Sequence, residues 1–234
     1  WFTQNWMLKI RFFSLIDKVF EMERNHYEHP YDVLHFATHN GYRFVLVFTP
    51  PWPLEDFQKD LLSVFCDRMA SAFDNLYLYQ QLRASNEATV IALADLAEYR
   101  DESTGRHIGR IKRLTDAVVE RLQEQGKFRE EINDVFKAMI GTAAILHDVG
   151  KVSTPDHILL KPGKLEPHEW AIMQTHAQIG ADLLAGDDTR LLRLAHEIAL
   201  NHHEKWDGSG YPNGLAGEAI PLSARIVAVA DVFD

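Results

Sequence analysis

The sequence contains a single cysteine, Cys66, in 234 residues. One thiol cannot build a disulfide framework, so a small disulfide-stapled secreted domain is excluded and a reducing compartment is expected. An uninterrupted apolar run is also missing, because the stretch from Trp6 to Phe20 is broken by charged residues: Lys9, Arg11, Asp17 and Lys18. The sequence therefore predicts no signal peptide, no membrane span and a cytoplasmic location.

Positive charge is in short supply too, with 24 Lys and Arg against 34 Asp and Glu and a net charge of −10. A protein that grips polymeric DNA or RNA needs a basic face for the phosphates, so that class of partner is disfavoured. A small dinucleotide is a different matter. Bound metal ions and a few local lysines could meet its phosphates: Lys151, Lys161, Lys164 and Lys205.

Proline and glycine are absent from Leu54 to Tyr99. Apolar residues recur there at spacings of three and four, which predicts one helix about 70 Å long at ~1.5 Å per residue. A small domain cannot bury so long a stripe, so we expect a homodimer through residues 54–100, formed as a parallel coiled coil. The alternative is a break near Ala84 to Asn86, with two helices that pack independently.

A small α+β region precedes this stretch. Asn5 to Glu23 has helical apolar spacing, whereas Tyr31 to Thr38 and Tyr42 to Thr49 read as strands joined by an Asn40-Gly41 hairpin turn. The region loosely resembles a GAF-like sensory domain. We expect a small regulatory domain over residues 1–85, ending in the long helix.

The C-terminal half carries a metal-ligand pattern. Two histidines are adjacent, a histidine and an aspartate are adjacent, and further candidates flank them: His107, His147, Asp148, His176, His202, His203 and Asp231. Adjacent residues on a helix point about 100° apart, so each pair could face one cavity and reach two different ions. Imidazole and carboxylate ligands without cysteine suit a first-row transition metal. Two ions of this kind activate a shared hydroxide and neutralise a phosphoryl group, so phosphoester hydrolysis is the expected chemistry.

Together these motifs resemble the HD-GYP family, bacterial phosphodiesterases of the HD superfamily that act on cyclic dinucleotides. The resemblance covers about Arg100 to the end of the chain. It rests on Arg100-Asp101 with Thr104 and His107, His147 to Lys151, His176, His202-His203, Gly208 to Pro212, and Ala230-Asp231. It implies that the seven candidates above bind metal and that Lys151 contacts the scissile phosphate. Asp148 is the best candidate for a ligand that spans both ions.

The loop after His203 has its own physical interpretation. Gly208 and Gly210 allow positive φ or a close backbone approach, Pro212 stiffens the exit, and Tyr211 and Trp206 offer flat faces for a base. The alternative is an ordinary surface turn, which is less attractive directly after two histidines. We therefore assign Gly208, Gly210, Tyr211 and Pro212 to substrate binding. The resemblance adds Lys151 to this set, and Asp148 and Lys151 are the expected catalytic pair.

The expected fold is mainly α, with an all-helical HD-type catalytic domain over residues 86–234. The expected reaction is hydrolysis of cyclic di-GMP to the linear dinucleotide pGpG, with two divalent transition-metal ions per chain, iron or manganese favoured. Three alternatives stay open: a mixed-base cyclic dinucleotide as substrate, an ordinary HD-type nucleotidase, and a non-catalytic dinucleotide-sensing module. The resemblance also implies a receiver-type input domain upstream and further helix downstream.

One position departs from the family pattern. Some HD-GYP members have a glutamate four residues before the first histidine ligand, where this sequence has Ser103. Glu102 is next to it, but a shift of one residue turns a side chain about 100° away. A hydroxyl is a poor substitute for a carboxylate on a hard cation. We therefore expect two metals, not three, and a reaction that stops at the linear dinucleotide.

Overall fold

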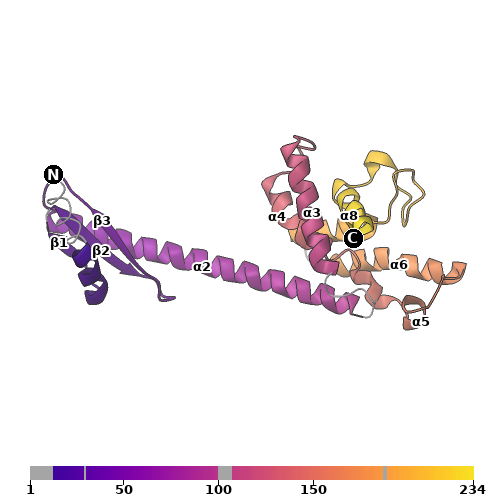
Figure 1. Cartoon of the computed structure of the whole chain (residues 1–234), viewed down its shortest axis with the longest axis horizontal. Helices are drawn as coiled ribbons and strands as arrows, with labels where there is room; N and C mark the ends of the chain where they lie inside the picture. Colours follow the sequence, from indigo (N-terminus) through magenta and orange to yellow (C-terminus); the bar gives the residue numbers. More distant parts are fainter. Residues whose placement is uncertain (1–12, 29, 100–106, 187–188) are drawn as a thin grey trace. The chain divides into compact units, whose positions relative to one another are not determined.

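The computed structural model describes residues 13–28, 30–99, 107–186 and 189–234 (Figure 1). The chain divides into two compact units, Trp1–Ala84 and Ser85–Asp234, called here the N-terminal and C-terminal units. One helix, α2 (Asp56–Glu98), begins in the first unit and ends in the second. Its 43 residues confirm the predicted long helix, and the alternative break near Ala84 is absent.

The N-terminal unit contains a three-stranded antiparallel sheet in the order β1-β2-β3. Its strands are β1 (His26–Glu28), β2 (Tyr31–Ala37) and β3 (Arg43–Phe48). β2 and β3 match the predicted strands, and Gly41 in their turn has a φ of 88°, which favours glycine. β1 was not predicted, because its three residues give no apolar run. Residues 13–22 are helical, and the earlier part of the helix predicted from Asn5 lies outside the described residues.

In this unit α2 covers the sheet through an aromatic contact. The Phe73 ring stacks on Phe44 at a centroid distance of 4.8 Å, and Cys66 is buried on the same side of the helix. Phe73, one of the apolar residues at helical spacing in this stretch, therefore faces the sheet. Leu61 and Phe65, further along the stripe, are 60% and 49% exposed.

All regular secondary-structure elements among the described residues of the C-terminal unit are helices, apart from one isolated β-bridge between Asp207 and Ala216. After the end of α2 it contains α3 (His107–Glu124), α4 (Asp134–Ala144), η1 (Val149–Ser153), α5 (Asp156–Leu159), α6 (Pro167–Leu184), α7 (Arg190–Asn201), η2 (Gly217–Ala219) and α8 (Leu222–Phe233). Helix α7 packs against α4, α6 and α8, while α3 packs against α4 and α8. The predicted all-helical domain is confirmed.

The centre of this unit is built from side chains with almost no exposure: Ile111, Ile140, Ile198 and Val227. Small residues such as Ala143 and Ala199 lie among them and let the helices approach closely. No helix in the described part of the chain is both long and apolar enough to cross a membrane.

Local sequence signals fix where the helices begin. The Asn133 side chain accepts a hydrogen bond from the Phe136 amide at the start of α4. Glu166 and Glu169 form a reciprocal capping box at the start of α6, and the Thr189 hydroxyl caps α7. Such caps satisfy amides that have no partner inside the helix, so they fix the residues at which α4, α6 and α7 begin.

Gly150 allows η1 to lie directly against α6. A Cβ at this position would lie 1.9 Å from the His176 carbonyl oxygen and 2.5 Å from the Gly180 amide nitrogen. Because both obstacles are backbone atoms, no side-chain rotation can relieve the overlap. The close crossing holds the turn at Asp148 beside the His176 segment.

We expect Gly150→Ala to destabilise the protein by at least ~1–3 kcal/mol, the usual cost of overpacking, as measured by urea unfolding. Gly109→Ala is the matched control. It lies inside α3, and its added Cβ would come no closer than 3.8 Å to Arg113. That change should be neutral or stabilising by up to ~1 kcal/mol. Equal stabilities for the two variants would contradict this account of the crossing.

Candidate metal centre and its cavity

The seven predicted ligands come together from five parts of the C-terminal unit. His107 is the first residue of α3, His176 lies in α6, and Asp231 lies in α8. The two adjacent pairs lie in turns just past helix ends: His147-Asp148 after α4, and His202-His203 after α7. The prediction that both pairs lie on helices is therefore wrong. A helix that ends leaves its following residues free to turn inward, which regular helical spacing cannot describe.

These side chains form two groups of potential ligands. The first group is Asp148, His176, His202 and His203, and the second group is His107, His147 and Asp231. Within each group one nitrogen or oxygen per residue lies within 4.8 Å of all the others. His147 and Asp148 thus fall in different groups, as expected. His202 and His203 differ from expectation, because both belong to the first group.

The hydrogen bonds of three histidines determine which ring nitrogen faces inward. Nδ1 of His147, His176 and His202 lies 2.7–3.0 Å from a carbonyl oxygen three residues earlier in the chain. A carbonyl can only accept, so each Nδ1 carries the proton. In the neutral ring each Nε2 then presents a lone pair, the form that binds metals.

The lone pairs of the first group converge without a proton between them. His176 Nε2 is 3.1 Å from His203 Nε2 and 3.2 Å from Asp148 Oδ1. His147 Nε2 and Asp148 Oδ1 are also buried without a hydrogen-bond partner among the described residues. Acceptors this close repel one another unless a cation lies between them. The donor set therefore fits a metal ion.

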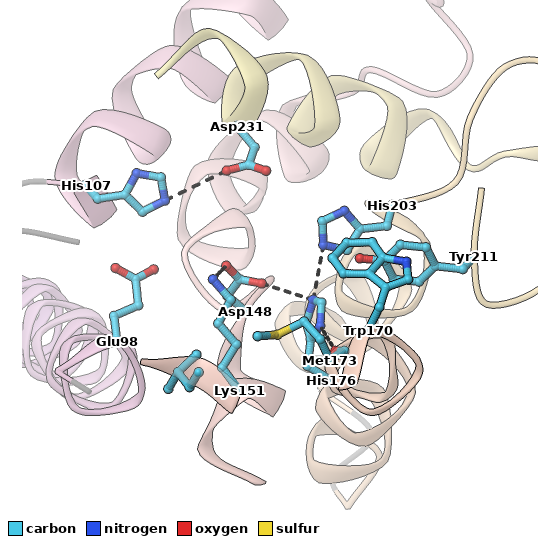
Figure 2. A pocket seen from close by; sticks show the side chains of 11 residues that line it. Glu98, His107, Asp148, Lys151, Trp170, Met173, His176, His203, Tyr211 and Asp231 are labelled. Atoms are coloured by element: carbon cyan, nitrogen blue, oxygen red, sulfur yellow. Dashed lines mark hydrogen bonds and ion pairs between the residues drawn. The ribbon is translucent and has the colours of Figure 1, made fainter. Parts of the chain in front are cut away.

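Asp148 lies between the two groups, as Figure 2 shows. Its Oδ1 is 3.2 Å from His176 Nε2 in the first group. Its Oδ2 is 3.4 Å from His147 Nε2 in the second group and 2.7 Å from Lys151 Nζ. One carboxylate therefore presents an oxygen to each group.

Electrostatics in the cluster favour a cation. Burial opposes protonation of His147, but the carboxylates of Asp148 and Asp231 outweigh it and raise the pKa of His147 to about 9. Burial together with His202 and His176 lowers the pKa of His203 to about 3, so His203 is neutral at pH 7. Burial would raise the pKa of Asp148, but His147 and other donors hold it well below its ordinary value. Without a metal the cluster thus combines ionised carboxylates and the neutral His203 imidazole with a protonated His147, whose Nε2 proton a metal ion would replace.

Both groups border one cavity of about 380 Å³. Figure 2 shows His107 and Asp231 at one end, Asp148 and Lys151 between, and the aromatic side chains at the other end. The lining residues are Glu98, His107, Asp148, Lys151, Leu159, Trp170, Met173, His176, His203, Tyr211 and Asp231. Lys151, predicted to contact substrate, therefore lies where a ligand near the ions would meet it.

The loop predicted to bind substrate contributes one side chain to this cavity. The Tyr211 ring stacks on His203 at 4.7 Å, whereas Gly208, Gly210 and Pro212 do not line the cavity. Trp206, the second predicted stacking face, is 64% exposed and lies outside it.

The glycines instead shape the loop. Gly208 has a φ of 79°, and a Cβ on Gly210 would lie 2.4 Å from the Lys205 amide nitrogen. Glu204 secures the loop from within, because its two carboxylate oxygens accept hydrogen bonds from the amides of Asn213 and Leu215.

Four cavity residues were not singled out from the sequence: Glu98, Leu159, Trp170 and Met173. Trp170 and Met173 lie six and three residues before His176 on α6, and this helical spacing could have revealed them. Glu98 ends α2 and is 5% exposed. Burial raises its pKa, and the Coulombic influence of His107 and His147 opposes this rise. Its only sequence signal is its closeness to the Arg100-Asp101 motif, which, like Ser103 and Thr104, lies outside the described residues.

Comparison with known families agrees with this geometry. The family model described as HD domain matches residues 92–234. The chain belongs to the HD domain family. A second family model, a domain of unknown function (DUF3369), matches residues 4–82. The predicted relationship to the HD superfamily is confirmed, whereas the GAF-like assignment of the N-terminal unit is not.

Curated relatives of this HD domain protein are named as phosphodiesterases. The 3′3′-cGAMP-specific phosphodiesterase 2 of Vibrio cholerae is 45% identical over 181 residues, which cover 77% of this chain and 33% of the relative. The cyclic di-GMP phosphodiesterase response regulator RpfG of Xanthomonas campestris is 48% identical, with 68% and 42% covered. A cyclic di-GMP phosphodiesterase of Thermotoga maritima is 50% identical, with 59% and 36% covered. The chain thus spans well under half the length of these relatives.

Proposed function

We propose that the C-terminal unit is a metal-dependent phosphodiesterase that hydrolyses cyclic di-GMP to linear pGpG in bacterial second-messenger signalling. The observation that carries the proposal is the position of Asp148, with one oxygen toward each ligand group and Lys151 beside it in a cavity walled by Tyr211. The names of relatives at 48–50% identity support the choice of substrate.

The first group would hold one ion and the second group another, with Asp148 shared. When bound, such ions supply an activated hydroxide and neutralise charge on the phosphoryl group. The five imidazoles favour iron or manganese over magnesium.

The chain's own side chains would then orient the substrate. Lys151 Nζ directs a positive charge into the cavity, where a phosphate oxygen gains negative charge as the bond breaks. Tyr211 and Trp170 offer aromatic surface for a base at the other end of the cavity. Their hydrocarbon bulk and that of Met173 also exclude water from one side of the ligand groups.

A mixed-base cyclic dinucleotide is the second candidate substrate. The 45% identical relative from Vibrio cholerae is named as specific for 3′3′-cGAMP. Aromatic stacking alone does not separate guanine from adenine, because every base has a π-face. Chromatography of the products from parallel incubations with cyclic di-GMP and 3′3′-cGAMP tests the choice between them.

Replacing Asp148 with alanine should remove bound metal and hydrolysis together, because the variant lacks the carboxylate shared by the two groups. The loss of activity should exceed the roughly 10–100-fold typical of residues that only support a ligand. Metal content and product chromatography measure the two effects, with the exposed Asp95→Ala as control. Wild-type protein that binds the dinucleotide with both metals but yields no product would favour a sensing module. Full activity in a metal-free Asp148→Ala protein would overturn the mechanism.

We further propose two metals per chain and a reaction that stops at the linear dinucleotide, since Ser103 offers no carboxylate near the first histidine ligand. Anomalous scattering should reveal two occupied sites, and Ser103→Glu should add a third. Three occupied sites in the wild-type protein would refute the proposal and direct attention to the Glu98 carboxylate, which lines the same cavity.

The same chain should form a homodimer through residues 54–100. The exposed Leu61 and Phe65 lie about 40° apart around α2, so one helix face presents both side chains. Phe65→Glu should raise the dimer dissociation constant by at least about tenfold in analytical ultracentrifugation. Ser63→Glu is the matched control, because Ser63 is exposed about 200° around the helix from either side chain. A wild-type monomer at high micromolar concentration would exclude the dimer.

A further inference from the structure

His107 differs from the three histidines that use carbonyl groups of their own segments. It is the first residue of α3, so no earlier turn of that helix can supply a carbonyl to its ring. Its Nδ1 instead lies 2.6 Å from Oδ2 of Asp234, a residue 127 positions later in the sequence. Its Nε2 faces Asp231 at 3.9 Å.

One helix end therefore supplies both carboxylates around this imidazole. Asp231 and Asp234 are three residues apart at the end of α8, which places them on the same face. Only 5% of the Asp234 side chain is exposed.

Arg110 holds the Asp234 carboxylate in place. The Arg110 guanidinium donates hydrogen bonds to both Asp234 oxygens, from Nε to Oδ1 and from Nη2 to Oδ2, the latter at 2.8 Å. The arginine lies three residues after His107 on α3. The side chains of His107, Arg110 and Asp234 therefore form one hydrogen-bonded cluster that links α3 to the end of α8.

We infer that Asp234 is a positioning residue for the second ligand group, fixing the His107 proton on Nδ1 so that Nε2 presents its lone pair beside Asp231. A carboxylate can only accept this hydrogen bond, which excludes the opposite tautomer. Support of this kind orients a ligand and raises its affinity for metal. The inference rests on the proposed metal site, to which it adds a residue outside the seven ligands.

The test is metal titration of metal-free protein with Mn²⁺, followed by calorimetry and elemental analysis. Asp234→Asn should lower the affinity for one of the two ions by about 10–100-fold and leave the affinity for the other unchanged. The reason is that an amide can donate to Nδ1 and move the proton to Nε2. Asp234→Glu should recover part of the affinity. Asp95→Asn is the matched control.

Arg110→Gln separates positioning from a purely structural tie between α3 and α8. It removes the ion pair but keeps the carboxylate beside His107, so metal affinity should fall less than in Asp234→Asn even where thermal stability falls equally. Two ions bound by Asp234→Asn with wild-type affinities would overturn the inference, as would equal losses of affinity in the two variants. Wild-type protein that binds no Mn²⁺ would instead overturn the proposed function.

Discussion

The C-terminal unit is organised around a cluster of hydrogen-bond acceptor atoms that repel one another. Unprotonated imidazole nitrogens and carboxylate oxygens approach within 3.1–3.5 Å around Asp148, with little solvent to separate them. Such an arrangement persists only if the surrounding packing prevents its members from moving apart. The isoleucines and alanines between α3, α4, α7 and α8 supply that constraint, and Gly150 brings the Asp148 turn against α6. Because the packing already fixes these side chains, binding of a cation would relieve the repulsion without a further loss of conformational freedom.

Much of the site was readable from the sequence because the ligands occur as short, unusual combinations. Adjacent His-Asp and His-His pairs predict a metal cluster wherever they lie in the fold, and the structure brings all seven candidates together. The division into two groups was only partly readable. It depends on how the chain turns after α4 and α7, and helical spacing says nothing about residues beyond a helix end.

Other features left no readable signal. The β1 strand is held by its pairing to β2, and its own three residues lack the alternation that marks a strand. Phe73 shares its helical spacing with exposed apolar residues of α2 such as Phe65, and only the position of the sheet distinguishes it. Asp234 gains its partners from α3, more than a hundred residues away, so no local pattern could have connected it to His107. Contacts of this kind join residues that are far apart in the sequence, so no short window of sequence contains both partners.

The short segment from His202 to Leu215 combines two imidazoles, a buried carboxylate anchor and an aromatic wall. Closing a loop of this size costs little chain entropy, so the segment can hold its shape largely by internal hydrogen bonds. A substitution at Tyr211 would therefore also change the surroundings of the imidazole it stacks against. If the proposed function holds, base recognition and ion binding would thus be tied together in this one segment, with Trp170 of α6 meeting Tyr211 edge-to-face at the same end of the cavity.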